Sequence, residues 1–241
     1  LRLADAHGRV ATDLRVSLTD RCNLRCTYCM PAEGLAWFPT DEVLSDAEVL
    51  RLIDIAVRLL GVQKIRFTGG EPLLRRSLEQ IVAGAKKVRT TTGGTPELSL
   101  TTNGIGLDKR VAALAEAGLN RVNVSLDSLD RERYAALARR DRLDAVLAGL
   151  AAAEAAGLLP VKVNAVVMRG HNEPDVVPLA QCCLERGYQL RYIEHMPLGP
   201  RHEWDRTRMV TQAEILALLN ERFTLSPAAE PRGAAPAELW Q

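Results

Sequence analysis

Short stretches of alternating apolar and polar residues separate longer helical patterns through most of the chain. Strands are predicted where apolar residues recur at every second position, at Leu14–Leu18, Lys64–Thr68, Glu97–Thr102, Arg121–Leu126, Val161–Val167 and Gln189–Glu194. Helical periodicity predicts helices near 45–60, 75–88, 108–117, 142–156, 173–186 and Thr211–Arg222. Strands that alternate with helices indicate parallel βα units, so the sequence predicts an α/β fold.

Start and stop signals support several of these helices. Ser45 with Glu48 forms a capping-box pattern, and the helix at Thr211 opens with a second Thr-x-x-Glu pattern. Glycine favours the left-handed conformation that commonly ends a helix, and it stands at predicted ends at Gly61, Gly118, Gly157 and Gly187. The stretch from Ser226 to Pro236 is rich in Pro and Ala and predicts an irregular tail.

The predicted strands have one polar and one apolar face. Side chains of a strand point alternately to opposite faces, and the polar set is Arg15, Ser17, Lys64, Arg66, Thr68, Ser99, Thr101, Asn123, Ser125, Lys162, Asn164 and Arg191. The apolar face must meet the helices. If the sheet curls, the polar face lines a hydrophilic cavity, as in an incomplete (β/α)6 barrel. An antiparallel sheet with one wet face is the alternative, and the helices between the strands argue against it.

Composition narrows the class of protein. The 241 residues carry a formal net charge of +1, which gives no support to nucleic-acid binding driven by bulk charge. No apolar run approaches the roughly 20 residues that a membrane-spanning helix needs. No secretory leader pattern is present, so we expect a cytoplasmic protein. Five cysteines in such a chain do not suggest a disulfide framework.

Three of these cysteines follow the first predicted strand. Cys22, Cys26 and Cys29 have the spacing C-x3-C-x2-C. Thiolates are ligands for zinc, Cu(I) and iron–sulfur clusters. Ordinary clusters use four cysteines, so three leave one iron open to a small-molecule chelator. A structural zinc site is the alternative; it needs a closed set of four ligands, and no fourth Cys or His lies within a few residues.

The cysteine motif, with the aromatic Tyr28 before its last cysteine, resembles the radical S-adenosylmethionine (SAM) signature. Gly69-Gly70-Glu71-Pro72, after the second predicted strand, is similar to that family's GGEP segment. The resemblance implies a partial (β/α)6 barrel. It also implies a [4Fe–4S] cluster on the three cysteines, with SAM chelating the remaining iron.

Longer segments look like the GTP 3′,8-cyclase family of molybdenum-cofactor biosynthesis. They are 14–22, 65–76, 100–104, 121–127, 161–164 and 191–197, in the family's order. The resemblance implies SAM contacts at Tyr28, Gly69, Gly70, Glu71, Pro72, Ser125 and Met196. It implies GTP contacts at Arg15, Arg66, Thr101 and Lys162, with Lys64 and Arg191 as further basic candidates.

The polar strand face supports an anionic substrate independently. Five of its residues are cations, which favour charge-assisted hydrogen bonds to phosphate. The alternative is that these cations are paired internally with Glu71, Asp127 or Glu194. His195 lies near the proposed site and is assigned no role.

The sequence departs from the family after Cys183. The resembled enzymes carry a second three-cysteine cluster in a C-terminal region and a Gly-Gly end, and neither occurs in this sequence. We therefore expect a radical SAM core over 1–225 and the start of a further region over 226–241. Such a piece is expected to hold the first cluster and SAM but to convert GTP poorly.

The resemblance implies a lyase that converts GTP to (8S)-3′,8-cyclo-7,8-dihydroguanosine 5′-triphosphate. Its expected partners are GTP and a reducing electron donor, with no nucleic acid and no membrane; a homodimer is left open. Two rival interpretations are another radical SAM reaction, such as peptide modification, and a zinc-stabilised scaffold without catalysis.

Overall fold

The computed structural model describes residues 3–197, 204–229 and 237–241. Its strands form one sheet in the order β1-β2-β3-β4-β5-β6, which confirms the predicted alternation of strands and helices. The contacts divide the chain into two compact units. The first unit is Leu1–Leu24, Glu33–Ser125 and Arg142–Lys162, and the second unit is Arg25–Ala32, Leu126–Asp141 and Val163–Gln241.

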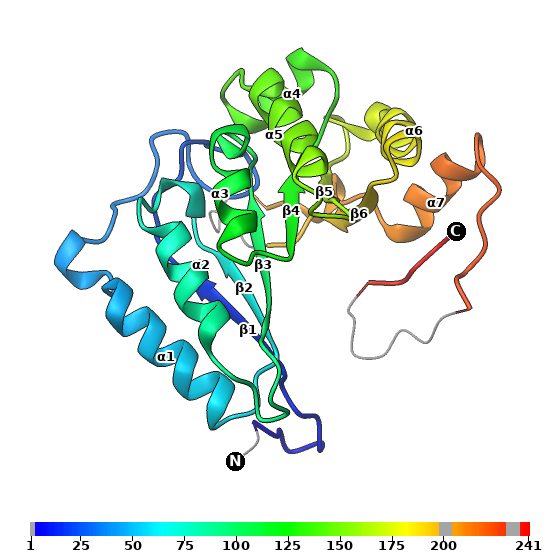
Figure 1. The fold of residues 1–241 in the computed structure, drawn as a ribbon. Coiled ribbons are helices and arrows are strands. Elements are labelled where there is room, and N and C mark those ends of the chain that lie inside the picture. The colour runs from blue at the N-terminus through cyan, green and yellow to red at the C-terminus, as the bar shows by residue number, and fades with distance from the viewer. Residues whose placement is uncertain (1–2, 198–203, 230–236) are drawn as a thin grey trace. The chain divides into compact units, whose positions relative to one another are not determined.

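The first unit contains four parallel strands with helices between them (Figure 1). Its strands are β1 (Asp13–Ser17), β2 (Lys64–Thr68), β3 (Glu97–Thr102) and β4 (Arg121–Ser125), and each pairs with the next in parallel. Its helices are α1 (Asp46–Arg58), α2 (Leu78–Lys87), α3 (Val111–Glu116) and α5 (Leu143–Ala155). The predicted strands are confirmed, with shifts of one residue at some ends.

Burial follows the predicted alternation along these strands. Ile65 and Phe67 on β2 are fully buried, and Leu98 and Leu100 continue that core on β3. The neighbouring Arg66 is only partly buried. The apolar strand face therefore forms the core, as the sequence predicts, because period-two side chains reach opposite sides of the sheet.

The helix ends have the capping groups that the sequence predicts. Ser45 and Glu48 form a capping box at the start of α1, which satisfies two backbone N–H groups that would otherwise lack partners. Gly61 follows this helix with φ of +80°, a conformation that favours glycine. Local sequence therefore fixes the limits of α1.

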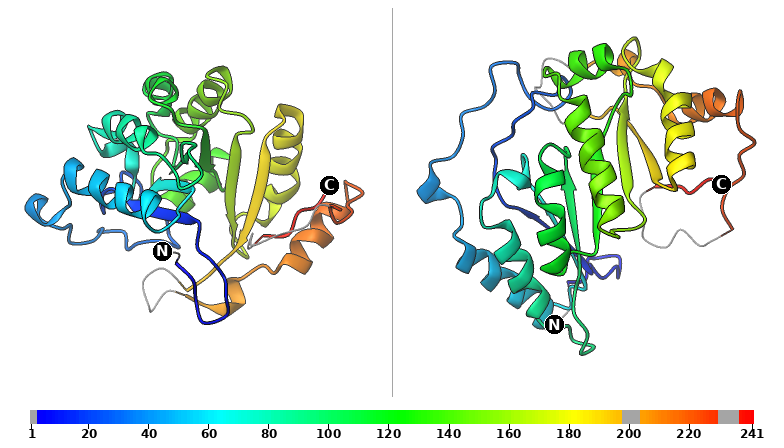
Figure 2. Two further views of the ribbon diagram at one scale, coloured as in Figure 1. Left: turned by 60° about the horizontal axis from the view of Figure 1, so that its bottom comes forward. Right: turned by 45° about the horizontal axis from the view of Figure 1, so that its top comes forward.

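The second unit has its own apolar core, and its helices and strands can be followed by colour in Figure 2. Its elements are α4 (Arg131–Ala138), β5 (Lys162–Val167, whose first residue belongs to the first unit), α6 (Val176–Arg186), β6 (Gln189–Glu194) and α7 (Gln212–Asn220). Val167, Val176 and Ile215 are central members of the core, and Leu190 and Tyr192 pack against it. Thr211 and Glu214 form the predicted capping box of α7.

Helix α4 was missed by the sequence reasoning. It has only eight residues, its first three are charged, and its buried residues Tyr134, Leu137 and Ala138 form an apolar stripe of about one turn, which is too short to stand out as a periodic pattern. One signal was available: Asp130 precedes it as N-cap and accepts a hydrogen bond from the Arg133 backbone N–H.

The predicted tail is only partly described, since residues 230–236 lie outside the described residues. The described remainder is more regular than expected. Pro227 and Trp240 form an antiparallel bridge, and the backbones of Ser226 and Gln241 exchange hydrogen bonds of 2.8 and 2.9 Å.

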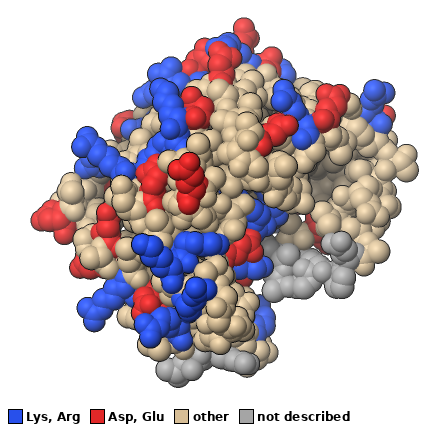
Figure 3. Space-filling view, viewed as in Figure 1, with Lys and Arg blue, Asp and Glu red and all other residues tan. Residues whose placement is uncertain are grey.

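The surface carries charges of both signs. On the face shown in Figure 3, acidic and basic side chains are interspersed over much of the surface. Among the described helices, none has both the length and the apolar character required to span a membrane.

Candidate functional site

The GGEP segment lies directly against the loop that leads from β1 to Cys22. The Gly70 N–H donates to the Thr19 carbonyl at 2.7 Å, and the Glu71 N–H donates to the Arg21 carbonyl at 2.8 Å. A Cβ on Gly70 would lie 2.3 Å from the Arg21 oxygen, and one on Gly69 would lie 2.3 Å from the Thr19 oxygen. Both glycines are therefore required for the close approach of two backbones.

Glu71 is buried, and both of its carboxylate oxygens accept hydrogen bonds from protein groups. One oxygen accepts from the Leu73 N–H at 2.9 Å and the Thr102 hydroxyl at 2.7 Å. The other accepts from the Asn103 N–H at 2.7 Å. Burial raises the pKa of Glu71, and these hydrogen bonds oppose the rise. The carboxylate thus joins the end of β2 to the end of β3, a role that sequence reasoning did not assign to it.

Asn103 lies between Glu71 and the first cysteine. Its amide nitrogen is 2.7 Å from the Asn23 side-chain oxygen and 3.9 Å from the sulfur of Cys22. Its side-chain oxygen accepts from the Ile105 N–H at 3.0 Å. The side chain therefore has a fixed orientation, with its donor group facing Cys22. Asn103 lies in the segment 100–104, which resembles the cyclase family, but the sequence alone gave this residue no function.

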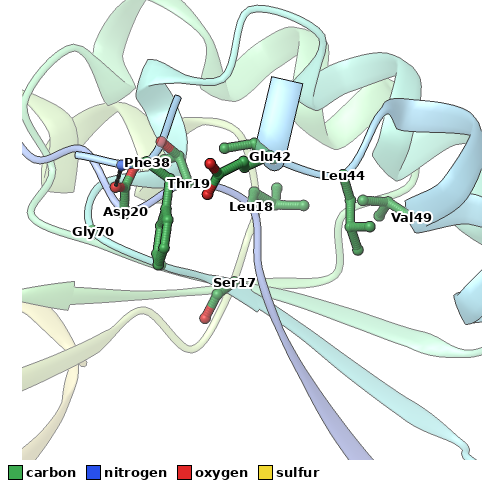
Figure 4. Close-up of a pocket in the computed structure, with 11 residues that line it drawn as sticks. Ser17, Leu18, Thr19, Asp20, Phe38, Glu42, Leu44, Val49 and Gly70 are labelled. Carbon is green, nitrogen blue, oxygen red and sulfur yellow. Dashed lines mark hydrogen bonds between the residues drawn. The ribbon is translucent and has the colours of Figure 1, made fainter. Parts of the chain in front are cut away.

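A cavity of about 330 Å³ lies beside this loop in the same unit, and Figure 4 draws the residues that line it. Thr19, Asp20 and Phe38 lie along one part of it, and the exposed Phe38 backbone donates to the Asp20 carboxylate at 2.6 Å. Gly69 and Gly70 also line it. The cavity therefore borders the segment that the resemblance assigns to SAM.

In the second unit, α4 holds the remaining part of the cysteine motif. The Arg25 and Thr27 N–H groups donate to carbonyls at the end of α4, at 3.1 and 2.9 Å. Arg139 follows this helix with φ of +53°, and its guanidinium donates to the Met30 carbonyl at 3.0 Å. A non-glycine residue in this conformation is uncommon. The missed helix is thus part of the support for Cys26 and Cys29.

Asp127 links Tyr28 to the end of β5. Its carboxylate accepts from the Tyr28 hydroxyl at 2.6 Å and from the Val166 N–H at 2.8 Å. Burial raises the pKa of Asp127 to about 6, against the effect of these two hydrogen bonds. Asn172 donates to the Asp127 carbonyl at 2.7 Å and completes the network.

The other predicted SAM contacts lie at strand ends. Pro72 is buried and opens a short turn after Glu71. Ser125 is the last residue of β4 and is partly buried. Met196 follows β6 and is 47% exposed, so its side chain is not part of the apolar core. Its neighbour His195 is buried.

Two predicted GTP contacts are neighbours on the sheet. Arg15 on β1 is in register with Arg66 on β2, so both side chains lie on the same face. Like charges directly opposite on neighbouring strands repel each other. A bound anion would relieve this repulsion. Thr101 lies on the same sheet face, and its hydroxyl accepts a hydrogen bond from Asn123 at 3.3 Å.

The other basic candidates have different surroundings. Lys64 is in register with Asp13 on one side and Glu97 on the other, so it has acidic neighbours. Lys162 and Arg191, on β5 and β6, are partly buried. The acids considered for internal pairing have other contacts: Glu71 and Asp127 as described, and Glu194, which accepts from the Gln212 N–H at 2.6 Å.

The chemistry of the cysteines fits an iron–sulfur cluster. None of the five cysteines, all of which are described, forms a disulfide; Cys22 and Cys26 are partly buried and Cys29 is exposed. None of their sulfurs is therefore part of a disulfide, and cysteine thiolates are ligands for iron–sulfur clusters. The described residues contain no ready-made group of three or more His, Cys, Asp or Glu that could hold a metal ion. The joint ligand set stays a prediction from the spacing.

Comparison with known proteins gives consistent matches. The model of the radical SAM superfamily matches residues 16–183. A GTP 3′,8-cyclase of Corynebacterium glutamicum is 68% identical over 238 residues, which cover 99% of this chain and 63% of that protein. A GTP 3′,8-cyclase of Mycobacterium sp. strain KMS is 59% identical over 239 residues, which cover 99% of this chain and 67% of that protein.

A solved structure is similar in fold. SuiB of Streptococcus suis bound to S-adenosylmethionine gives a TM-score of 0.60 at 18% identity, over 77% of this chain and 39% of that one. This likeness and the strand order confirm the predicted α/β fold class. The chain spans 63% of the length of the Corynebacterium relative.

Proposed function

We propose, because the chain belongs to the radical SAM superfamily and within it to the GTP 3′,8-cyclase family, that it is the SAM-cleaving part of such a cyclase. The whole enzyme would convert GTP to (8S)-3′,8-cyclo-7,8-dihydroguanosine 5′-triphosphate, in molybdenum-cofactor biosynthesis. The observation that carries this proposal is the 68% identity across 238 residues to a protein of that name.

In this proposal, Cys22, Cys26 and Cys29 hold a [4Fe–4S] cluster. The cluster and SAM together would supply the one-electron chemistry that produces a 5′-deoxyadenosyl radical, with an external reductant as electron donor. The protein contributes orientation. The N–H groups on either side of Cys26 donate to carbonyls at the end of α4 and hold this part of the motif.

The proposed SAM contacts are those that the resemblance implies, at Tyr28, Gly69, Gly70, Glu71, Pro72, Ser125 and Met196. The structure supports different roles within this set. Gly70 lines the cavity and lies so close to the neighbouring backbone that a side chain at this position would collide with it. The two oxygens of Glu71 already accept three hydrogen bonds from protein groups. Glu71 would therefore act by holding the neighbouring backbone in position.

The proposed GTP contacts are Arg15, Arg66, Thr101 and Lys162, with Arg191 and Lys64 as further candidates. The adjacent Arg15 and Arg66 give the strongest physical support, since a triphosphate would offset the repulsion between them. Lys64 has the weakest support, because carboxylates flank it in the sheet.

We also propose that residues 1–225 form the radical SAM core and that 226–241 begin a further region with a second [4Fe–4S] cluster. The greater length of the Corynebacterium relative supports this division. A cytoplasmic location is proposed with it, since proteins of reducing compartments keep their cysteines out of disulfides.

Turnover by the full-length gene product tests the function. The protein is reconstituted without oxygen, reduced, and supplied with SAM and GTP. We expect 5′-deoxyadenosine and the cyclised nucleotide in equal amounts. Production of 5′-deoxyadenosine that never depends on GTP, with modification of peptides from a library instead, would overturn the assignment in favour of peptide chemistry.

Binding by the present chain tests the substrate site separately. Arg66→Ala is expected to weaken GTP binding at least tenfold, because a charge-assisted contact is lost. Lys87→Ala, which removes an exposed cation at the end of α2, is the matched control and should bind GTP normally. Equal affinity of both variants would contradict the proposed site.

A further inference from the structure

We propose that Asn103 is a positioning residue that donates a hydrogen bond from its side-chain amide to the thiolate of Cys22. The inference rests on the proposed function, because it assumes that Cys22 binds the cluster. It adds a residue to which neither the motif nor the resemblance gave a role.

The geometry of the Asn103 side chain is the first argument. Its amide nitrogen lies 3.9 Å from the Cys22 sulfur, within range of a hydrogen bond to sulfur, and 2.7 Å from the Asn23 oxygen. Because an amide nitrogen carries two hydrogens, it can donate to both at once. The Ile105 N–H, 3.0 Å from the other end of the side chain, identifies that end as the oxygen. The nitrogen must then face the cysteine.

The support behind Asn103 is the second argument. The buried Glu71 carboxylate accepts from the Asn103 N–H at 2.7 Å and from the Thr102 hydroxyl at 2.7 Å. A buried carboxylate is costly unless several donors satisfy it. The hydrogen bond from the Asn103 N–H to the Glu71 carboxylate therefore holds the backbone of Asn103 in place. The acidic residue of the GGEP segment would in this way orient a group that faces the first cysteine.

The expected consequence is electrostatic. A donor aimed at a cysteine sulfur stabilises the added negative charge of a reduced cluster, and hydrogen bonds to sulfur are among the factors that set cluster potentials. Removal of the Asn103 donor should therefore lower the midpoint potential. It should also strengthen the iron–thiolate bond, because less sulfur electron density is shared with the N–H group.

The test compares Asn103→Ala and Asn103→Asp with the wild type. The aspartate is nearly isosteric and still accepts from Ile105, but it lacks the donor and adds a negative charge. The present chain is reconstituted without oxygen, and iron and sulfide are counted. The midpoint potential is then followed by electron paramagnetic resonance, and the iron–thiolate stretching frequencies by resonance Raman spectroscopy.

Both variants should show a lower potential than the wild type, with the larger shift in Asn103→Asp, and raised stretching frequencies. Asn220→Asp, at the exposed end of α7, is the charge-matched control and should show neither change. Wild-type potential and frequencies in the variants would overturn the inference. So would loss of the cluster from both variants accompanied by loss of folded structure in circular dichroism, since the role would then be purely structural.

Failure of the inference can be distinguished from failure of the proposed function. If the wild type takes up no iron and sulfide, the cluster proposal is wrong and the inference falls with it. If the wild type holds a full cluster and the variants match it, only the role of Asn103 is refuted.

Discussion

Replacing Gly70 by alanine should destabilise the protein even with no ligand bound. A Cβ at this position would lie 2.3 Å from the Arg21 carbonyl oxygen and 2.4 Å from that of Asp20. Both neighbours are backbone atoms, so no side-chain rotation can relieve the contact. The two segments must therefore separate by roughly 1 Å to reach ordinary van der Waals distance.

The size of the effect follows from what this separation breaks. The hydrogen bonds from Gly70 N–H to Thr19 and from Glu71 N–H to Arg21 measure 2.7 and 2.8 Å. Each contributes about 1 kcal/mol net, and overpacking adds about 1–3 kcal/mol. We therefore expect the free energy of unfolding to fall by about 3–5 kcal/mol, as a sum of these terms.

Urea unfolding of the apo protein measures this free energy. Gly94→Ala is the matched control, because Gly94 is exposed, has no positive φ, and its nearest new contact would be the Thr90 hydroxyl at 3.7 Å. That change should alter stability by less than about 1 kcal/mol, in the stabilising direction.

Hydrogen exchange locates the change. In Gly70→Ala the amides of residues 70 and 71 should exchange much faster than in the wild type. If Gly70→Ala unfolds like the control and its amides remain protected, the close approach of the two segments is not what requires this glycine.

Three further predictions concern the second unit. Asp127 has a pKa of about 6 in the folded protein against 3.8 ordinarily, so the folded state binds more protons between these values. Stability should fall by up to about 3 kcal/mol as pH rises from about 4 to about 6. Asp127→Asn should remove this pH dependence. If thermal melts of the variant show the same pH profile as those of the wild type, the raised pKa of Asp127 is refuted. Arg133→Ala should lower the free energy of unfolding in urea more than Asp175→Ala does. The first change leaves the buried Asp175 carboxylate without its cation, whereas the second leaves an arginine that is 38% exposed and can be solvated. The reverse order would contradict this reasoning. Cys26→Ser should lose the iron and sulfide that Cys182→Ser retains after reconstitution, and equal contents would refute the ligand assignment.

The sequence was sufficient to predict the strands because their pattern depends on burial alone. β2, β3 and β6 have the predicted limits, and the apolar residues of β2 are fully buried. Helix α4 was not predictable in the same way. Its charged sequence has a weak apolar stripe, and its contacts with the cysteine motif join residues more than 100 positions apart.

In the candidate site, too, the features that are local in sequence were predictable and those that depend on distant contacts were not. The cysteine spacing and the GGEP segment could be recognised because each is local in sequence. The partners of Glu71 could not, since Thr102 and Asn103 lie about thirty residues away and only folding brings them to its carboxylate. A carboxylate in a motif predicts a contact to a ligand. The structure shows that its oxygens accept from protein donors.

The central claim is that three thiolates hold a [4Fe–4S] cluster with one iron open to SAM. Electron paramagnetic resonance of the reduced protein, prepared without oxygen and recorded before and after SAM is added, tests it most directly. The account predicts about four irons and four sulfides for each chain, and a spectrum that changes when SAM binds. One zinc in place of the cluster, or a cluster spectrum that SAM leaves unaltered, would contradict it.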